Sequence, residues 1–365
     1  MLRFSLVRRL NVWPLVLITL LATIGILMLY SAANGSLYPW GVKQLGRFGV
    51  GFLLMLVVAI TDSRTWFANA YLLYGLSLLL LIAVEVMGFI GMGAQRWIDL
   101  YIFNLQPSEL MRVGLVLALA RYFHGCSLQE IGRVDTLMIP ACMIIVPTLL
   151  VMRQPDLGTA CMLLLSGAAL FFVAGVRIWK FAIMGGGVLA FIPILWSCLH
   201  TYQQQRILIF LNPESDPMKS GYHVTQSKIA LGSGGIWGKG FLQGSQSHLN
   251  FLPEKQTDFI FTMFGEEFGL IGAIILMSLY ALLIIHNFQI ALQCRSQFGR
   301  FVGIGLTTTF FLYAFINMAM VMGILPVVGI PLPFISYGGT AMMTLLVSQG
   351  LIFSVALHND IRVRR

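Results

Sequence analysis

The most regular feature of the chain is a series of long apolar runs separated by short polar segments. Each run is close to the length of about 20 residues that an α-helix needs to cross a bilayer. The runs are continuous and do not alternate between apolar and polar positions, so they predict helices and not the strands of a membrane barrel. Ten spans are expected, at about 12–33, 45–61, 68–90, 107–123, 136–152, 157–175, 179–198, 262–286, 301–323 and 338–357.

Two longer segments interrupt this pattern. The first, at about 199–261, lies between the seventh and eighth spans and is glycine-rich in its second part. The second, GILPVVGIPLPFISYGG (323–339), contains prolines and glycines that do not continue a helix. Such backbone must be covered by protein or line a wet cavity at membrane depth. We therefore predict an all-α polytopic membrane protein, a single domain over residues 1–365, with a large extracytoplasmic loop between helices 7 and 8.

Composition supports this prediction and excludes other classes. The chain has 365 residues, of which 58% are hydrophobic and 10% charged, and its mean hydropathy is +0.85. A soluble domain cannot bury so much apolar surface. The net charge of +9 is distributed loop by loop, without the basic clusters that a nucleic-acid partner requires. The five cysteines have no paired spacing, so neither a disulfide framework nor a zinc site is indicated.

The distribution of Lys and Arg predicts the orientation. The first span is too long for the apolar region of a cleaved signal peptide and is expected to be a retained anchor. Most basic residues of the short loops fall on the side of the N-terminus, whereas Lys43, Arg47, Arg96 and Arg153 fall on the other side. The excess of positive charge marks the cytoplasmic face. We expect both termini in the cytoplasm and the loop at 199–261 outside it.

Charged residues at membrane depth are candidates for chemistry, because inserting each costs about 2.5–3.5 kcal/mol. They lie in four places, namely Glu85, QPSE (106–109) with Arg112, QPD (154–156), and Asp258 with Glu266 and Glu267. Most of them also have a structural interpretation. Proline suits a first helical turn, and a carboxylate there meets the positive end of the helix dipole. Glu109 and Arg112 are three residues apart and form a pair that would brace one helix.

Asp258 is the strongest candidate for a general base. It follows the long outward loop in LPEKQTDFIF (252–261), and its aromatic neighbours limit access of water. Partly apolar surroundings disfavour the charged carboxylate and raise its basicity. The alternative is that Asp258 caps the eighth span. An outward-facing reaction has no nucleotide triphosphate available, so a polymer-forming reaction there needs a pre-activated substrate such as a membrane-anchored pyrophosphate.

The glycine-rich stretch GSGGIWGKGFLQGSQ (232–246) is not predicted to bind phosphate. It lacks the GxxxxGK[ST] pattern, follows no predicted strand and faces the compartment without nucleotides. A flexible, turn-rich linker is the alternative interpretation.

These motifs resemble the SEDS family (shape, elongation, division and sporulation), and within it the RodA branch. The matching stretches appear in the expected order across the expected ten spans and cover nearly all of the outward non-helical chain. They are RWIDLYIFNLQPSEL (96–110), QPDLGTA (154–160), GYHVTQSKIALGSGGIWGKGFLQGSQSHLNFLPEKQTDFIFTMFGEEFGLIG (221–272) and GILPVVGIPLPFISYGG (323–339).

The resemblance implies a peptidoglycan glycosyltransferase of the bacterial cytoplasmic membrane that polymerises lipid II at the outer face during cell elongation. It also implies a class B penicillin-binding protein as partner, and contacts with lipid II, the growing glycan and membrane lipid. Asp258 matches the family's essential aspartate, and Glu109 matches a glutamate near the same cavity. Arg112 stands where the family commonly has lysine and exchanges a compact ammonium for a planar fork.

The expected mechanism is an inverting displacement in which Asp258 accepts the proton of the attacking sugar hydroxyl. Glu109 would orient the acceptor or a cation. The remaining substrate-binding candidates supply positive charge for the leaving diphosphate or polar contacts to the sugar. They are Arg96, Gln106, Ser108, Arg112, Lys228, Lys239, Glu254 and Thr257. No cofactor is indicated with certainty, and a divalent cation (Mg²⁺ or Mn²⁺) is an open prediction.

Two other functions fit the same topology. A transporter that flips lipid II across the membrane would also have many spans, charges at membrane depth and interrupted helices. A non-catalytic scaffold that holds the penicillin-binding partner would retain a similar outward cavity.

Overall fold

The computed structural model describes residues 12–91, 94–99, 104–190, 196–197, 201–212, 220–249 and 254–358. Ten of the described helices lie at the positions of the ten predicted spans, which confirms the helical membrane fold. They are α2 (Val12–Ala32), α3 (Gly41–Ile60), α4 (Ser63–Met87), α5 (Pro107–Gly125), α7 (Val134–Arg153), α8 (Leu157–Ala174), α9 (Ile178–Ala190), α14 (Ile260–Gln293), α15 (Gln297–Val321) and α16 (Gly339–Leu357). The shorter elements are α6 (Leu128–Ile131), α11 (Thr201–Leu211), α12 (Ser220–Ser233), α13 (Ser245–His248), β1 (Phe89–Gly91), β2 (Ala94–Asp99) and β3 (Asn104–Leu105).

Length and hydropathy support the membrane assignment. Within the described part of the chain, eight helices are long and apolar enough to cross a bilayer. Helix α5 is not among them, and it carries Glu109, Arg112 and Arg121. Helix α9 is not among them either, and its described length is 13 residues. Large apolar side chains such as Leu53 of α3 are exposed on the outside of the bundle, where a bilayer would cover them.

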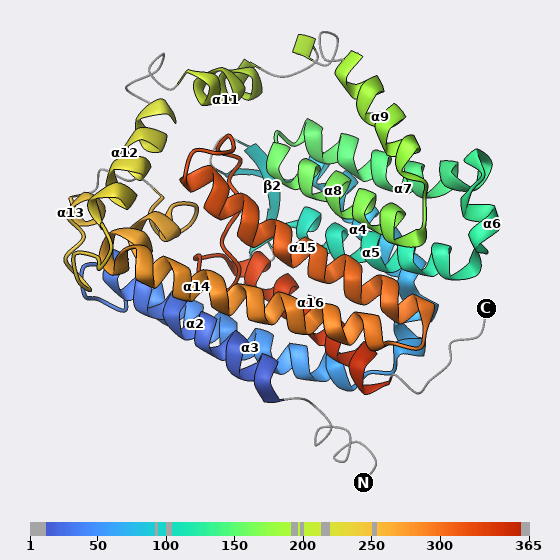
Figure 1. The fold of residues 1–365 in the computed structure, drawn as a ribbon, viewed down its shortest axis with the longest axis horizontal. Coiled ribbons are helices and arrows are strands. Elements are labelled where there is room, and N and C mark those ends of the chain that lie inside the picture. The colour runs from blue at the N-terminus through green and yellow to red at the C-terminus, as the bar shows by residue number, and fades with distance from the viewer. Residues whose placement is uncertain are drawn as a thin grey trace.

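The bundle is organised around α15 and α16. Figure 1 shows α2, α3 and α14 on one side of this pair and α4, α5, α7 and α8 on the other. The buried apolar side chains form two clusters that follow the same division. Helix α15 contributes Phe310 to the first cluster and Leu306 to the second, so it belongs to both halves of the core.

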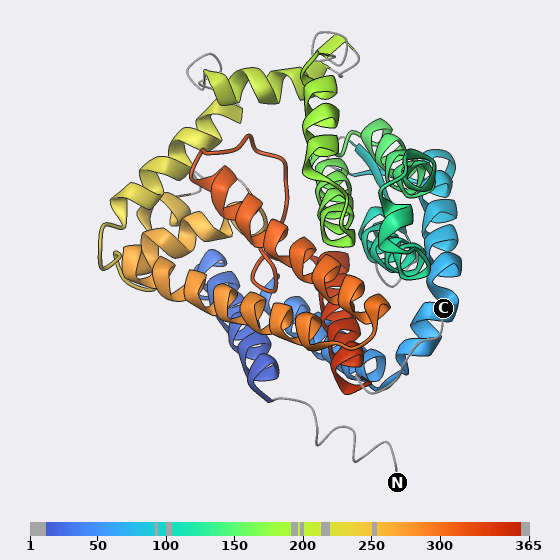
Figure 2. The same cartoon turned by 45° about the vertical axis from the view of Figure 1, so that its right-hand side comes forward.

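The predicted outward loop contains three helices within its described residues. They are α11, α12 and α13, and Figure 2 shows α11 and α12 following α9, the helix of the seventh predicted span, at the top of the view. Helix α12 is attached to the bundle through Ser227, whose Oγ lies 2.8 Å from Thr262 Oγ1 and donates a hydrogen bond to Val321 O at 2.9 Å. Helix α12 therefore packs against the ends of α14 and α15 that carry Thr262 and Val321.

A small antiparallel sheet adds to the predicted all-α architecture. It has the order β1-β2-β3 and connects the end of α4 to the start of α5. Phe89 is paired with Trp97, and Ile98 with Leu105. The sheet brings Arg96 next to the start of α8, as described below.

The glycine-rich stretch has a structural role. Helix α14 is interrupted at Gly269, whose φ of 66° and ψ of −163° are not helical. The stretch supplies backbone hydrogen bonds at this break, because Gly240 N donates to Glu267 O at 3.0 Å and Leu270 N donates to Gly235 O at 2.9 Å. A Cβ at Gly269 would lie 2.3 Å from Gly238 N, so glycine is required for this close approach. The stretch is thus bonded to α14.

Candidate functional site

Asp258 lies directly before α14 and does not cap it. The capping position is Phe259, which makes no side-chain capping bond. The Asp258 carboxylate is partly buried and makes no hydrogen bond to any described residue. Burial raises the pKa of Asp258 to about 6, and the nearby carboxylate of Glu254 adds to the rise. The carboxylate is therefore not used to stabilise the helix and is free to accept a proton.

Charged residues from three other segments act electrostatically on Asp258. The guanidinium groups of Arg206 and Arg96 act on its pKa in the downward direction, and the carboxylate of Asp156 acts upward. Arg206 comes from α11, Arg96 from β2 and Asp156 from the start of α8, so segments far apart in sequence meet at one place. Sequence reasoning had not assigned Arg206 to the site. Its position in a long loop of ordinary composition gave no signal for this role.

Glu109 and Arg112 form a buried ion pair in the first turn of α5. Glu109 Oε2 also accepts hydrogen bonds from Tyr313 Oη at 2.7 Å and Thr344 Oγ1 at 3.0 Å. The guanidinium of Arg112 lies over the Tyr313 ring, with Cζ 4.3 Å from its centroid. The pair therefore braces α5 and also joins it to α15 and α16. Tyr313 and Thr344 lie inside apolar spans and were not predicted as site residues.

The QPSE and QPD motifs lie against each other at the starts of α5 and α8. Asp156 caps α8, because it accepts bonds from Thr159 N at 3.1 Å and Thr159 Oγ1 at 2.8 Å. This confirms the structural interpretation of the QPD motif. Gln106 Nε2 donates to Asp156 Oδ2 at 3.2 Å, which links the two motifs directly.

Arg96 is held beside these motifs by backbone carbonyls. Its Nε donates to Gln154 O at 3.1 Å, and a second guanidinium nitrogen contacts Pro155 O. Gln154 in turn donates from Nε2 to Leu81 O at 2.9 Å. The cation is thus fixed at the start of α8 without an ion pair to Asp258 in the described part of the chain. Ser108 is buried in the first turn of α5.

Four further candidates lie in the region of the outward loop. Thr257 Oγ1 donates to Glu254 Oε2 at 3.1 Å, which places both residues beside Asp258. Lys239 forms an ion pair with Glu266 at 2.8 Å, between Nζ and Oε1. The side chain of Lys228 lies against the backbone of Gly323. Among the described residues, neither lysine is one of the charged groups that act on Asp258.

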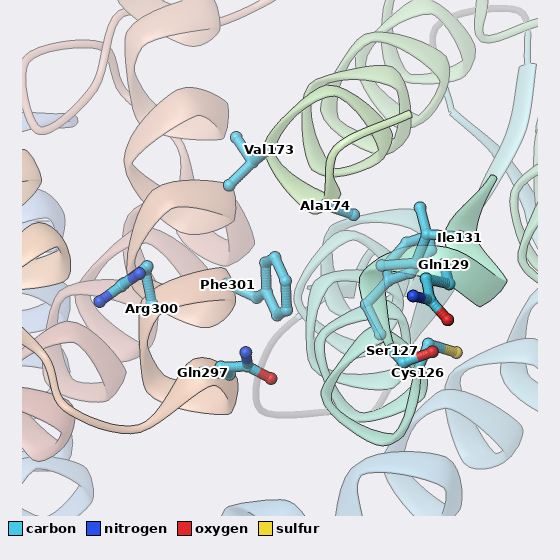
Figure 3. Close-up of a pocket in the computed structure, with 10 residues that line it drawn as sticks. Cys126, Ser127, Gln129, Ile131, Val173, Ala174, Gln297, Arg300 and Phe301 are labelled. Carbon is cyan, nitrogen blue, oxygen red and sulfur yellow. The ribbon is translucent and has the colours of Figure 1, made fainter. Parts of the chain in front are cut away.

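A cavity of about 520 Å³ lies at the other end of the bundle. Figure 3 shows Phe301, Gln297 and Ser127 among the residues around it. These belong to the start of α15 and to the turn after α5, far along the helices from Asp258. The cavity is thus separate from the charged cluster. The described residues contain no group of three His, Cys, Asp or Glu side chains suited to a metal ion, and the divalent cation stays a prediction.

Comparisons with known proteins define the family. The chain is 44% identical over 358 residues to the peptidoglycan glycosyltransferase MrdB of Escherichia coli (strain K12), a match that covers 94% of this chain and 93% of the relative. It superposes with a TM-score of 0.82 and 32% identity on a chain of a peptidoglycan synthase complex described as coordinating polymerization and crosslinking, covering 96% of this chain and 98% of that one. The Thermus thermophilus rod shape determining protein RodA gives a TM-score of 0.72 at 28% identity, with 96% of this chain and 97% of that one covered.

The family model for FtsW, RodA and SpoVE, described as cell cycle proteins, matches residues 12–361. This match spans nearly the whole chain and confirms the resemblance inferred from the outward motifs. The chain belongs to the FtsW, RodA and SpoVE family.

Proposed function

We propose that this chain polymerises lipid II into glycan strands at the outer face of the cytoplasmic membrane, with Asp258 as the general base. The chain is a peptidoglycan glycosyltransferase, as its 44% identity to MrdB indicates. The observation that supports the role of Asp258 is the state of its carboxylate, which is partly buried, does not cap α14 and has a pKa raised by burial to about 6. A base of this kind is ionised at neutral pH and is more basic than an ordinary aspartate.

The proposed reaction is a single displacement with inversion. The 4-hydroxyl oxygen of the acceptor sugar forms a bond to the anomeric carbon of the donor while the bond from that carbon to the diphosphate oxygen breaks. The hydroxyl proton passes to Asp258, and the undecaprenyl diphosphate leaves with the electron pair of the broken bond. Charge on the leaving group develops away from the base, so cations at the opposite side of the sugar favour this step.

Arg96 and Arg206 are the proposed cations for the leaving diphosphate, because both lie within electrostatic range of Asp258. Arg112 is engaged by Glu109 and lies over an aromatic ring, which favours a role in holding α5, α15 and α16 together. Glu109 would then act through this buried pair and the position of the helix starts. Glu109 and Arg112 are thus proposed to support the site by holding these helices in position.

The orientation and the partner complete the proposal. The excess of basic residues in the short loops on one side supports an orientation with both termini in the cytoplasm and Asp258 outside. A class B penicillin-binding protein is the proposed partner, supported by the likeness to a synthase complex that coordinates polymerization and crosslinking. Lipid II, the growing glycan and membrane lipid are the other proposed contacts.

The test is glycan formation from lipid II by the purified protein, with and without a penicillin-binding partner. Asp258→Asn keeps the shape of the side chain and removes the base, so it is expected to abolish polymerisation. Asp135→Asn is the matched control, because Asp135 is exposed and pairs with Arg133 near the start of α7. Polymerisation by Asp258→Asn at the wild-type rate would contradict the proposed mechanism. Movement of labelled lipid II across liposomes without glycan formation would instead favour a transporter, and neither activity would favour a scaffold.

A further inference from the structure

The three successive backbone carbonyls of residues 256–258 accept hydrogen bonds from the end of α15 and from the segment that follows it. Gln256 O accepts from Tyr337 N at 2.8 Å, and Thr257 O accepts from Ser336 Oγ at 2.6 Å. Asp258 O accepts from Asn317 Nδ2 at 3.0 Å. The backbone of the candidate base is therefore fixed residue by residue from outside its own segment.

Asn317 differs from the other two donors because it connects three segments. It lies on α15, one turn before the helix ends at Val321, and its side chain is fully buried. The same Nδ2 atom that donates to Asp258 O also donates to Ile330 O at 2.7 Å. Both partners are carbonyl oxygens, so the amide nitrogen must face them. The two hydrogens of one amide group thus hold the segment before α14 against the irregular segment between α15 and α16.

This connection sets the surroundings of the Asp258 carboxylate. Ile330 follows Gly329, whose φ is +75°, and a Cβ built on Gly329 would lie 3.4 Å from Asp258 Oδ2. The absence of a side chain at Gly329 leaves the backbone itself as the wall next to the carboxylate. Because Asn317 bonds to the residue after Gly329 and to Asp258, it fixes both sides of this contact.

We propose that Asn317 is a positioning residue, which holds the backbone of Asp258 against the Gly329–Ile330 segment and so sets where the carboxylate meets the acceptor hydroxyl. The inference rests on the proposed function of Asp258 as the base. Among the described residues, the side-chain hydrogen bonds of Asn317 go to backbone carbonyls, and Asn317 takes no part in proton transfer. A base must reach its proton within about 2.6–3.2 Å between heavy atoms. A misplacement of about 1 Å lowers a rate by about 100-fold.

The test compares two buried asparagines of the full-length purified protein. Asn317→Leu keeps a similar volume and removes both donors. Asn287→Leu is the matched control, because Asn287 is fully buried in α14 and donates from Nδ2 to Gln349 Oε1 at 3.0 Å. Each variant loses a buried amide, but Asn317→Leu leaves two backbone carbonyls without this donor and Asn287→Leu leaves one side-chain oxygen, so the unfolding temperature is compared together with the kinetics. For both, kcat and KM for lipid II, the pH–rate profile and the unfolding temperature are measured.

The positioning role predicts that kcat of Asn317→Leu falls between about 10-fold and 100-fold below that of Asn287→Leu, with little change in KM. The acid limb of its pH–rate profile moves to lower pH, because a carboxylate released from this contact is better solvated. A kcat and a pH–rate profile equal to those of Asn287→Leu would overturn the inference.

A second variant keeps the test valid if Asn317→Leu does not fold. Asn317→Ser keeps one hydroxyl donor, which lies nearer the backbone than Nδ2 and serves at most one of the two carbonyls. Its kcat is expected to be no lower than that of Asn317→Leu and below that of Asn287→Leu. Equal kcat and pH profiles for Asn317→Ser and Asn287→Leu would overturn the inference. Asp258→Asn in the same series tests the role of Asp258 separately from that of Asn317. Activity of this variant would refute Asp258 as the general base. If it is inactive, the comparison of the Asn317 variants with Asn287→Leu decides whether Asn317 positions the base.

Discussion

The pH dependence of polymerisation is the prediction that follows most directly from the state of Asp258. Burial raises the pKa of this carboxyl from 3.8 to about 6. A general base acts in its deprotonated form, so the rate is expected to rise with pH through about 6 and to level off above it. At pH 5 about a tenth of the carboxyl groups are ionised, and at pH 7 about nine tenths are. The rate at pH 5 is therefore expected to be about a tenth of the plateau rate.

The assay is the initial rate of glycan formation from lipid II between pH 4.5 and 8, with saturating and with limiting substrate. The Glu254→Gln variant assigns the observed titration to Asp258, because the Glu254 carboxylate contributes to the raised pKa of Asp258 and its loss moves the acid limb to lower pH. Glu254 is exposed, so this displacement is expected to be small. A rate that is independent of pH between 5 and 7, in a preparation that stays folded throughout, would refute the reasoning.

Three further predictions concern stability. The folded-state pKa of Asp258 is higher than its unfolded value, so the folded protein binds more protons between 3.8 and about 6 and loses stability as pH rises through this window. At pH 8 the Asp258→Asn variant is therefore expected to be more stable than the wild type, by at most about 3 kcal/mol in the free energy of unfolding, and to unfold at a higher temperature. At pH 4 the two proteins are expected to unfold at the same temperature. A lower unfolding temperature of the variant at pH 8 would contradict this sign. Tyr313→Phe removes the 2.7 Å hydrogen bond to Glu109, and denaturant unfolding should show a loss of about 1.5–3 kcal/mol, whereas an unchanged midpoint would show that the bond contributes nothing. Lys239→Met leaves the buried Glu266 without its ion-pair partner, so the free energy of unfolding should fall by about 1–3 kcal/mol and the unfolding temperature with it. KM for lipid II should not change. A raised KM at unchanged stability would instead support a role of Lys239 in diphosphate binding.

The hydropathy of the sequence was sufficient to predict where ten of the described helices lie, eight of which are long and apolar enough to cross a bilayer. A bilayer imposes a minimum length on each span, and this constraint is visible in the sequence without knowledge of packing. The irregular segment 323–339 was also predicted, because its prolines prevent a helix, and the structure begins α16 only at Gly339. The QPSE and QPD motifs were correctly placed at helix starts, where their prolines and carboxylates are favoured.

Features that depend on contacts between distant segments were not predicted. Helices α11 and α12 lie in a stretch whose composition suggested only a loop, and α12 is held there by packing against α14 and α15. Arg206 acts on Asp258 although it belongs to α11 and Asp258 precedes α14, so this relation depends on how segments far apart in sequence are arranged. Asn317 is a single amide in an apolar span, and attention to charged groups alone passes over it. An uncharged polar side chain at membrane depth also requires a partner, and that rule would have marked this position.

The central claim is that the Asp258 carboxylate faces the exterior, where the sugar of lipid II is available. The most direct test is labelling of a single cysteine at position 258 with a membrane-impermeant maleimide, in intact spheroplasts and in inverted vesicles, after the native cysteines have been replaced. The account predicts labelling in spheroplasts and protection in inverted vesicles. Labelling only in inverted vesicles would place the side chain in the cytoplasm and contradict the account.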